Sequence, residues 1–455
     1  MKGRRVKSQQ RNSLRSLAVV WLALVAACSG GDHDELELWR GVNAMSEGRW
    51  QAARAFFEAD LEQRERLESV RYAAISWSEG RLQSGGRAVA YFRRFLAVEP
   101  GDVGMRRRLV RMLLLLGDFE PAAVEAAALD DSAASNRLRA VVQRELDLDA
   151  AREAIDRALE QQPAAASGHA TAATIYDALG EFELARHHAE RAVALAPLDA
   201  RSRYLAGRLQ ARLGASERAT ETLRLYEVVV TIIGQGSTTR PAPTHELRLL
   251  GELAGHGGGS SPATRLRIAS LLLKTGQHAA AREELELLAD APELTPENWL
   301  GMGKVATESG ARALAGTLYQ RVIDRYAPPA PAAGGDRWLD SAPSREARFR
   351  LALLAVQEGD RAEARRLISS GLRELPQAGR WLCLRGALEL ADGGGESAVR
   401  NLADGLRYAP WRDSCRIDLV SVHLARGERE EARELLAAAP EPSAALERLR
   451  VQHAL

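Results

Sequence analysis

The sequence predicts an all-α fold, a right-handed α-solenoid of about eleven helix-turn-helix repeats. Three observations support this prediction. Alanine, leucine, arginine and glutamate dominate the 455 residues, whereas β-branched and aromatic residues are sparse, which favours helices over strands. Glycine, alanine and proline recur at a fixed interval along most of the chain. Between them, large apolar residues follow at three and four positions, the spacing of one helical face.

The interval of the repeat is 34 residues. Glycines are spaced in this way within three sets: Gly180 and Gly214; Gly276 and Gly310; Gly359, Gly393 and Gly427. An alanine five positions later keeps the step: Ala185 and Ala219; Ala281 and Ala315; Ala364, Ala398 and Ala432. Prolines at the end of the unit do the same: Pro163 and Pro197; Pro376 and Pro410. Glycine suits the residue that ends a first helix with positive φ, and proline stops the second helix.

Segment 167–199 carries the pattern most completely, at eight positions: Ala173, Tyr176, Gly180, Phe182, Ala185, Ala189, Ala192 and Pro197. The first copy has it at Gly41, Gly48, Trp50, Ala53 and Phe57. These residues and their spacing resemble the tetratricopeptide repeat. The resemblance implies helix pairs stacked into a superhelix, whose first helices line a concave groove that takes an extended peptide or a partner helix.

The copies fall into three blocks. Six are expected in residues 36–229, two in 262–329 and three in 345–445. The insertion 230–261 is rich in Gly, Ser and Pro at its ends, and 244–254 within it predicts one short extra helix. A Pro/Gly-rich linker is expected at 330–344, and a C-terminal tail at 446–455. Both insertions are interpreted as hinges, with binding loops as the alternative.

The N-terminus has the pattern of a secretory signal. Residues 1–27 hold six cations and no acid, and end in the uncharged run 17–27, which is too short to span a bilayer. The run leads into Val25-Ala26-Ala27-Cys28, which resembles the bacterial lipobox. The resemblance implies that Cys28 is lipidated and becomes the first mature residue, with 28–35 as a polar tether. Ser29 favours the outer membrane, facing the periplasm. The alternative is an ordinary cleaved signal with an incidental cysteine.

Charge and motifs argue against other function classes. Without its six N-terminal cations the chain has 56 basic (62 − 6) and 61 acidic residues, a balance that gives no general attraction to nucleic acid. The nine histidines form no metal pattern, and no phosphate-binding or nucleophile motif is present. We therefore expect no enzyme activity, no cofactor and no metal. Cys383 and Cys415, at nearly equivalent positions of neighbouring copies, are either a disulfide or two small buried residues.

The resemblance places a set of first-helix residues in the binding groove: Trp77, Arg107, Arg111, Asp177, Arg201, Tyr204, Arg208, Arg212, Lys304 and Phe349. Four of them, from Arg201 to Arg212, have the spacing of one helical stripe. With Lys304 they would form a basic centre that binds carboxylates. The alternative is an ordinary solvated, arginine-rich face.

These features predict a non-catalytic scaffold for protein–protein interaction, anchored in the membrane and without nucleic-acid partners. Lipidated repeat proteins of this type resemble assembly factors for pili, secretion pores and exopolysaccharide export. One alternative is a periplasmic carrier that binds a polysaccharide or peptidoglycan strand, which would need exposed aromatic side chains in the groove. Another is an enzyme subunit whose partner supplies the catalysis.

Overall fold

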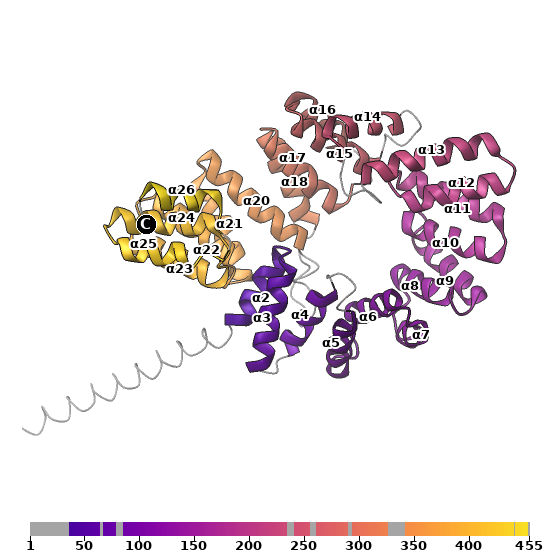
Figure 1. The fold of residues 1–455 in the computed structure, drawn as a ribbon, viewed down its shortest axis with the longest axis horizontal. Coiled ribbons are helices and arrows are strands. Elements are labelled where there is room, and N and C mark those ends of the chain that lie inside the picture. Colours follow the sequence, from indigo (N-terminus) through magenta and orange to yellow (C-terminus); the bar gives the residue numbers. More distant parts are fainter. Residues whose placement is uncertain are drawn as a thin grey trace, which may run out of the picture. The chain divides into compact units, whose positions relative to one another are not determined.

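The computed structural model describes residues 36–63, 67–78, 85–233, 241–254, 261–289, 294–325, 342–440 and 442–453. Over these ranges it contains 24 α-helices and no strand (Figure 1). None of these helices combines the length and the apolar character needed to cross a membrane. The expectations for the signal sequence, Cys28 and the polar tether lie outside the described residues. The chain divides into two units: unit 1 is Met1–Tyr91 with Leu375–Leu455, and unit 2 is Phe92–Glu374.

The helices of unit 1 come from both ends of the chain. They are α2 (Leu36–Ser46), α3 (Trp50–Gln63), α4 (Leu67–Ser78), α22 (Gly379–Ala391), α23 (Glu396–Tyr408), α24 (Asp413–Ala425), α25 (Arg429–Ala437) and α26 (Ala444–Gln452). Helix α5 (Gly85–Val98) contains the boundary between the units.

The helices of unit 2 come from one continuous stretch of the chain. They are α6 (Val103–Leu116), α7 (Phe119–Ala127), α8 (Ala133–Gln143), α9 (Leu148–Gln161), α10 (Ala166–Leu179), α11 (Phe182–Leu195), α12 (Ala200–Arg212), α13 (Ser216–Ile233), α14 (Pro243–Leu253), α15 (Pro262–Lys274), α16 (His278–Ala289), α17 (Pro296–Glu308), α18 (Arg312–Arg325), α20 (Ala342–Glu358) and α21 (Arg361–Glu374). Taken in chain order over the described residues, the helices form eleven pairs, with α14 and α26 left over.

The ends of some predicted segments differ in the structure. Helix α13 continues to Ile233, into the predicted insertion, and α14 is the short helix expected there. The segment predicted as a C-terminal tail from 446 is mostly helix α26. Ser443 caps this helix by accepting a hydrogen bond from the Leu446 backbone N–H, and the Leu446 side chain is buried. A serine that precedes apolar residues is a helix-start signal, so this helix could have been predicted from the sequence.

The turn between the helices of a pair depends on glycine. Nine glycines of the described residues have positive φ: Gly48, Gly117, Gly180, Gly214, Gly276, Gly310, Gly359, Gly393 and Gly427. At Gly180, for example, φ is 82° and the backbone N–H caps the end of α10. A side chain at this φ would be strained, which accounts for the recurrence of glycine and confirms the role predicted for it.

Small residues in the first helix allow its partner to approach closely. A Cβ at Gly207 would lie 2.8 Å from Cγ of Leu223, on α13, and a Cβ at Gly386 would lie 2.7 Å from Cγ of Leu402, on α23. Both distances are shorter than a real carbon–carbon contact. The glycines therefore determine how deeply a second-helix leucine packs against the first helix.

A side chain also holds the proline that ends a helix pair. Four residues, each six positions after such a proline, contact its carbonyl oxygen: Arg106 at Pro100 (2.7 Å), His169 at Pro163 (2.9 Å), Arg203 at Pro197 (3.0 Å) and Arg416 at Pro410 (2.5 Å). Arg203 and Arg416 are almost fully buried. Each contact ties the end of one pair to the first helix of the next, because the proline belongs to the first pair and the side chain to the helix that follows.

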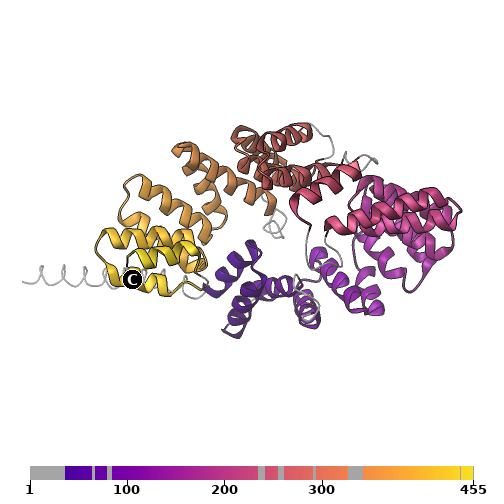
Figure 2. The ribbon, with the colours of Figure 1, turned by 45° about the horizontal axis from the view of Figure 1, so that its top comes forward.

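First helices contact the next first helix more closely than second helices contact the next second helix. Successive first helices, such as α8, α10 and α12, pack against one another as well as against their own partners. Contacts between successive second helices are weaker or absent among the described residues. Figure 1 and Figure 2 both show α10, α11 and α12 side by side in unit 2. Within unit 2, the first helices from α6 to α12 thus form the closer layer, with each first helix against the next.

Candidate protein-binding surface

Helix α12 exposes a single stripe of side chains. Arg201, Tyr204, Arg208 and Arg212 are exposed, whereas the residues between 204 and 208 and those at 202, 203, 209 and 210 are buried. This pattern follows from helical spacing, since positions three and four apart share a face. The structure therefore brings these four predicted residues together on the outside of one first helix.

Each residue of the stripe except Arg201 has an intramolecular neighbour. Arg208 forms an ion pair with Asp177 of α10, the first helix of the preceding pair. The guanidinium carbon of Arg212 lies 3.7 Å from the centre of the Phe182 ring.

The aromatic member of the stripe also has a neighbour. The rings of Tyr204 and Tyr226 are 5.3 Å apart between centres. The guanidinium of Arg201 has no hydrogen-bond or ion-pair partner within the described part of the chain. The stripe is therefore held in place by α10, α11 and α13, and one of its charges is available to a ligand.

A hollow of about 400 Å³ opens between two other first helices, α6 and α8. Its walls carry apolar side chains between two arginines: Arg111, Leu114, Leu115, Arg137, Leu138 and Val141. Leu115 is 63% exposed, an unusual state for a large aliphatic side chain. The hollow therefore combines apolar surface with positive charge at its edge.

The hollow and the stripe occupy equivalent positions of the repeat. Arg111 and Arg208 both lie six residues before the turn glycine of their pair, Gly117 and Gly214 respectively. Leu115 and Arg212 both lie two residues before it. Because first helices from α6 to α12 contact one another in order, these residues belong to one side of unit 2. We call the ten residues of the stripe and the hollow the first-helix face.

Arg107, another residue predicted in the groove, forms hydrogen bonds and an ion pair within the chain. Its guanidinium binds both carboxylate oxygens of Asp130, at 2.8 and 3.0 Å, and the hydroxyls of Ser132 and Ser135. Hydrogen bonds from Ser135 and then from Arg107 lower the pKa of Asp130 to about 2. This network fixes the loop before α8, where Ser132 is the N-cap.

Three further predicted residues, Trp77, Lys304 and Phe349, lie on other first helices, α4, α17 and α20. In unit 1, Trp77 donates its indole N–H to Glu58 at 3.0 Å, and the guanidinium carbons of Arg54 and Arg87 lie 4.8 and 5.0 Å from its ring centre. Lys304 on α17 and Phe349 on α20 are each half-buried. The basic centre expected from Lys304 with the four α12 residues stays a prediction.

Sequence reasoning missed the hollow. The signal was present in residues 112–116, where Met-Leu-Leu-Leu-Leu supplies more apolar positions than one buried helical face can use. Arg137 and Val141 gave no signal of their own, because only the packing of α8 on α6 places them beside these leucines.

Two of the histidines, His169 and His188, pack against each other. The two Nδ1 atoms of His169 and His188 are 2.9 Å apart, and the His188 ring stacks on Tyr176 with 5.4 Å between centres. Burial, and secondarily the charges of His169 and His187, lower the pKa of His188 to about 4. No cluster of three or more metal-ligating side chains occurs in the ranges that the structure covers.

Comparison with known proteins supports the repeat. Residues 170–228, which span α10 to α13, match the family model of the tetratricopeptide repeat. Together with the eleven helix pairs and their turn glycines in the described residues, this match supports a tetratricopeptide-repeat protein. Such an array indicates a protein–protein interaction scaffold. No curated protein matches the sequence.

Solved structures with some likeness include yeast Tom70, at 10% identity and a TM-score of 0.35, with 92% of this chain and 94% of that chain covered. Pseudomonas aeruginosa pilF has 18% identity and a TM-score of 0.24, covering 50% and 93%. MamA has 19% identity and a TM-score of 0.30, covering 32% and 88%. At these scores none of them bears on the argument.

Proposed function

We propose that the chain is a non-catalytic scaffold that binds other proteins on its first-helix face. A lipid on Cys28 anchors it to the outer membrane, on the periplasmic side. There it supports the assembly of an envelope complex, such as a pilus, a secretion system or an exopolysaccharide exporter. The observation that carries the binding part is the exposed hollow at Leu115, with Arg111 and Arg137 at its edge.

The chemistry of the face defines the kind of partner. Exposed aliphatic side chains between guanidinium groups suit a peptide or helix with apolar side chains flanked by carboxylates. A glycan ligand would need exposed aromatic rings for stacking. Of the three aromatics predicted in the groove, Tyr204 alone is strongly exposed, at 48%. The carrier alternative therefore has less support than the scaffold.

The test is crosslinking of the tagged full-length protein in its own cells, followed by purification from membranes. Three forms are compared: the natural chain, an Arg201→Glu/Arg208→Glu/Arg212→Glu variant, and an Arg191→Glu/Arg218→Glu control. The control reverses two exposed arginines on the neighbouring second helices, Arg191 on α11 and Arg218 on α13. We expect one or two envelope proteins at near-equal amounts with the natural chain and the control, and loss from the triple variant. Equal recovery with all three forms, or recovery of glycan without protein, contradicts the proposal.

The anchor is tested separately. Cys28→Ser should abolish incorporation of labelled fatty acid and release the protein from membranes, because the thiol of Cys28 is the acceptor of the lipid. Continued fatty-acid labelling of this variant would show that another site is used. Absence of labelling in the natural chain would favour an ordinary cleaved signal.

A further inference from the structure

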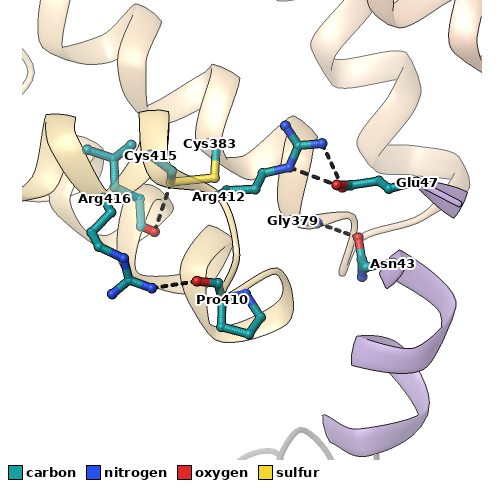
Figure 3. The surroundings of a disulfide bond; sticks show 9 residues. Asn43, Glu47, Gly379, Cys383, Pro410, Arg412, Cys415 and Arg416 are labelled. Carbon is teal, nitrogen blue, oxygen red and sulfur yellow. Dashed lines mark hydrogen bonds and ion pairs between the residues drawn. A yellow bond between two sulfur atoms is a disulfide. The ribbon is translucent and has the colours of Figure 1, made fainter. Parts of the chain in front are cut away.

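The first helix of the array contacts helices near the end of the chain. Within unit 1, α2 lies against the start of α22 and against residues 407–412, the end of α23 and its connection to α24 (Figure 3). Residues 334 to 367 positions apart are joined in this way. A simple open stack would leave α2 and α22–α24 without such a contact, so the contact needs its own explanation.

A buried amide forms the centre of the contact. Asn43 of α2 is 2% exposed. Its Oδ1 accepts a hydrogen bond from the backbone N–H of Gly379 at 2.9 Å, and its Nδ2 donates to the carbonyl oxygens of Gln377 at 2.9 Å and Trp39 at 2.8 Å. The amide is thus satisfied by groups from both ends of the chain. Without α22 the oxygen and one amide hydrogen would lose these partners, which makes the match specific.

An ion pair flanks the amide. Glu47 accepts hydrogen bonds from the indole N–H of Trp411 at 2.7 Å and from the guanidinium of Arg412 at 2.6 and 3.1 Å. Figure 3 shows Arg412 extended toward Glu47, and Asn43 directed at Gly379. On the other side, Nε of Arg40 donates to the carbonyl oxygen of Arg407 at 2.9 Å. These contacts are side-chain specific and mostly polar.

Aromatic contacts complete the surface. The rings of Phe56 on α3 and Trp411 are 6.3 Å apart between centres, and the guanidinium carbon of Arg49 lies 5.3 Å from the Trp411 ring centre. Trp411 and Arg412 are only half-buried. Surfaces of this kind, part polar and part exposed, are typical of contacts that form and dissociate.

The receiving surface is held by a disulfide. Cys383 of α22 and Cys415 of α24 are bonded, with 5.4 Å between their Cα atoms, which decides between the two alternatives that the sequence left open. The bond crosses α23 at Gly405, where a Cβ would lie 2.5 Å from Sγ of Cys383. It joins the two helices whose starts, at Gly379 and just after Arg412, meet α2. The site for α2 is therefore preorganised.

We propose that residues 40–56 and 377–412 form a clasp, a reversible docking contact by which the first helix of a chain binds the α22–α24 end of the same chain. Connection within one chain gives α2 a high effective concentration at this site, which allows a polar contact of modest intrinsic strength to stay closed. Opening the clasp uncovers Phe56, Trp411 and the Asn43 amide. The clasp uses none of the first-helix face and stands independently of the proposed partner binding.

The first test follows the Gly379 amide by hydrogen exchange of the full chain. Glu47→Arg and Arg412→Glu should each speed exchange in residues 377–382 by tenfold or more, and leave α10–α12 unchanged. The double variant restores opposite charges and should exchange more slowly than either single variant. A control, Glu363→Arg, removes an exposed ion pair with Arg366 in unit 2 and should leave residues 377–382 unaffected. Unchanged protection in both single variants would overturn the clasp.

The second test asks which copy provides α2. The variant Cys28→Ser/Glu47→Cys/Arg412→Cys is prepared in light and ¹⁵N-labelled forms, which are mixed and treated with a short bismaleimide. Crosslinked peptides that join position 47 to position 412 should be light–light or heavy–heavy only. Because the maleimide bonds are permanent, the crosslink accumulates even though loss of the Glu47–Arg412 pair makes the clasp open more often. Mixed peptides would show that α2 docks on a second copy, and absence of the crosslink would show that the contact does not form. Either result overturns the proposal.

Discussion

Two regions of the molecule use the same repeat in different ways. In α10–α13, buried Arg203 holds the carbonyl of Pro197, and in α24 buried Arg416 holds that of Pro410. Beyond this shared contact they differ, because α12 turns a stripe of arginines to the exterior whereas α22–α24 are crosslinked by a disulfide and covered by α2. One helix-pair design thus serves both to present an open surface and to receive another part of the chain.

The largest expected difference between the regions concerns the disulfide. Replacing both Cys383 and Cys415 by alanine should lower the free energy of unfolding of the α22–α24 region by about 3 to 4 kcal/mol, because the bond closes a loop with a sequence separation of 32. Hydrogen exchange should accelerate in α22–α24 and stay unchanged in α10–α12. Equal acceleration in both regions would mean that they unfold as one cooperative body.

Lowering the pH should instead destabilise α10 and α11 more than α22–α24. The pKa of His188 is about 4 in the folded chain, against 6.5 for a free histidine, mainly because the ring is buried. A depressed pKa means that the unfolded chain binds the proton first, so stability is fully present above pH 6.5 and falls as the pH drops toward 4. The loss is at most about 3 kcal/mol.

Local hydrogen exchange between pH 7 and pH 4.5 measures this effect. It should appear in α10 and α11, which carry His169 and His188. Asp156 of α9 also faces His188, and its charge acts in the opposite direction by raising the pKa of His188. His188→Gln should remove the pH dependence, and exposed His187 serves as the control, since His187→Gln should retain it. A pH profile that is the same in all three forms would rule out His188 as the group responsible.

The arginine–proline contact that both regions share can be tested with the same substitution at each site. Arg203→Met and Arg416→Met each keep the volume of the stem but remove the donor to a buried carbonyl, which should cost about 1 to 3 kcal/mol at either site. Denaturant unfolding monitored in each region measures the two losses. Similar values would indicate that the repeat, and not its surroundings, sets the energy. A much larger loss at Arg416 would show that the clasp depends on it.

The smallest effect is expected at the surface pair of Asp177 and Arg208. Arg208 is half exposed, so Asp177→Asn should change stability by no more than about 1 kcal/mol. Its effect on partner binding should be larger and favourable, because it frees a guanidinium of the first-helix face. Titration of the partner found by crosslinking checks this. A weaker complex would mean that Asp177 orients Arg208 for binding.

Much of this architecture was predictable from residues with local roles. The glycines at positive φ, the small residues of first helices and the prolines after second helices act within one helix pair, so their 34-residue spacing predicted the pairs. The stripe on α12 was predicted from the resemblance and from the three-and-four spacing of its residues. The C-terminal helix was missed, although Ser443 supplied its cap.

The sequence by itself determined the helix pair, its turn and which residues of α12 face outward, because these depend on contacts within about one repeat. Tertiary structure alone decided that Arg107 binds Asp130, that Leu115 borders a hollow with Arg137, and that Cys383 bonds to Cys415. It also decided that Asn43 meets Gly379. No periodicity encodes such pairings, since each depends on how successive pairs are rotated against one another and on where the two ends of the chain meet.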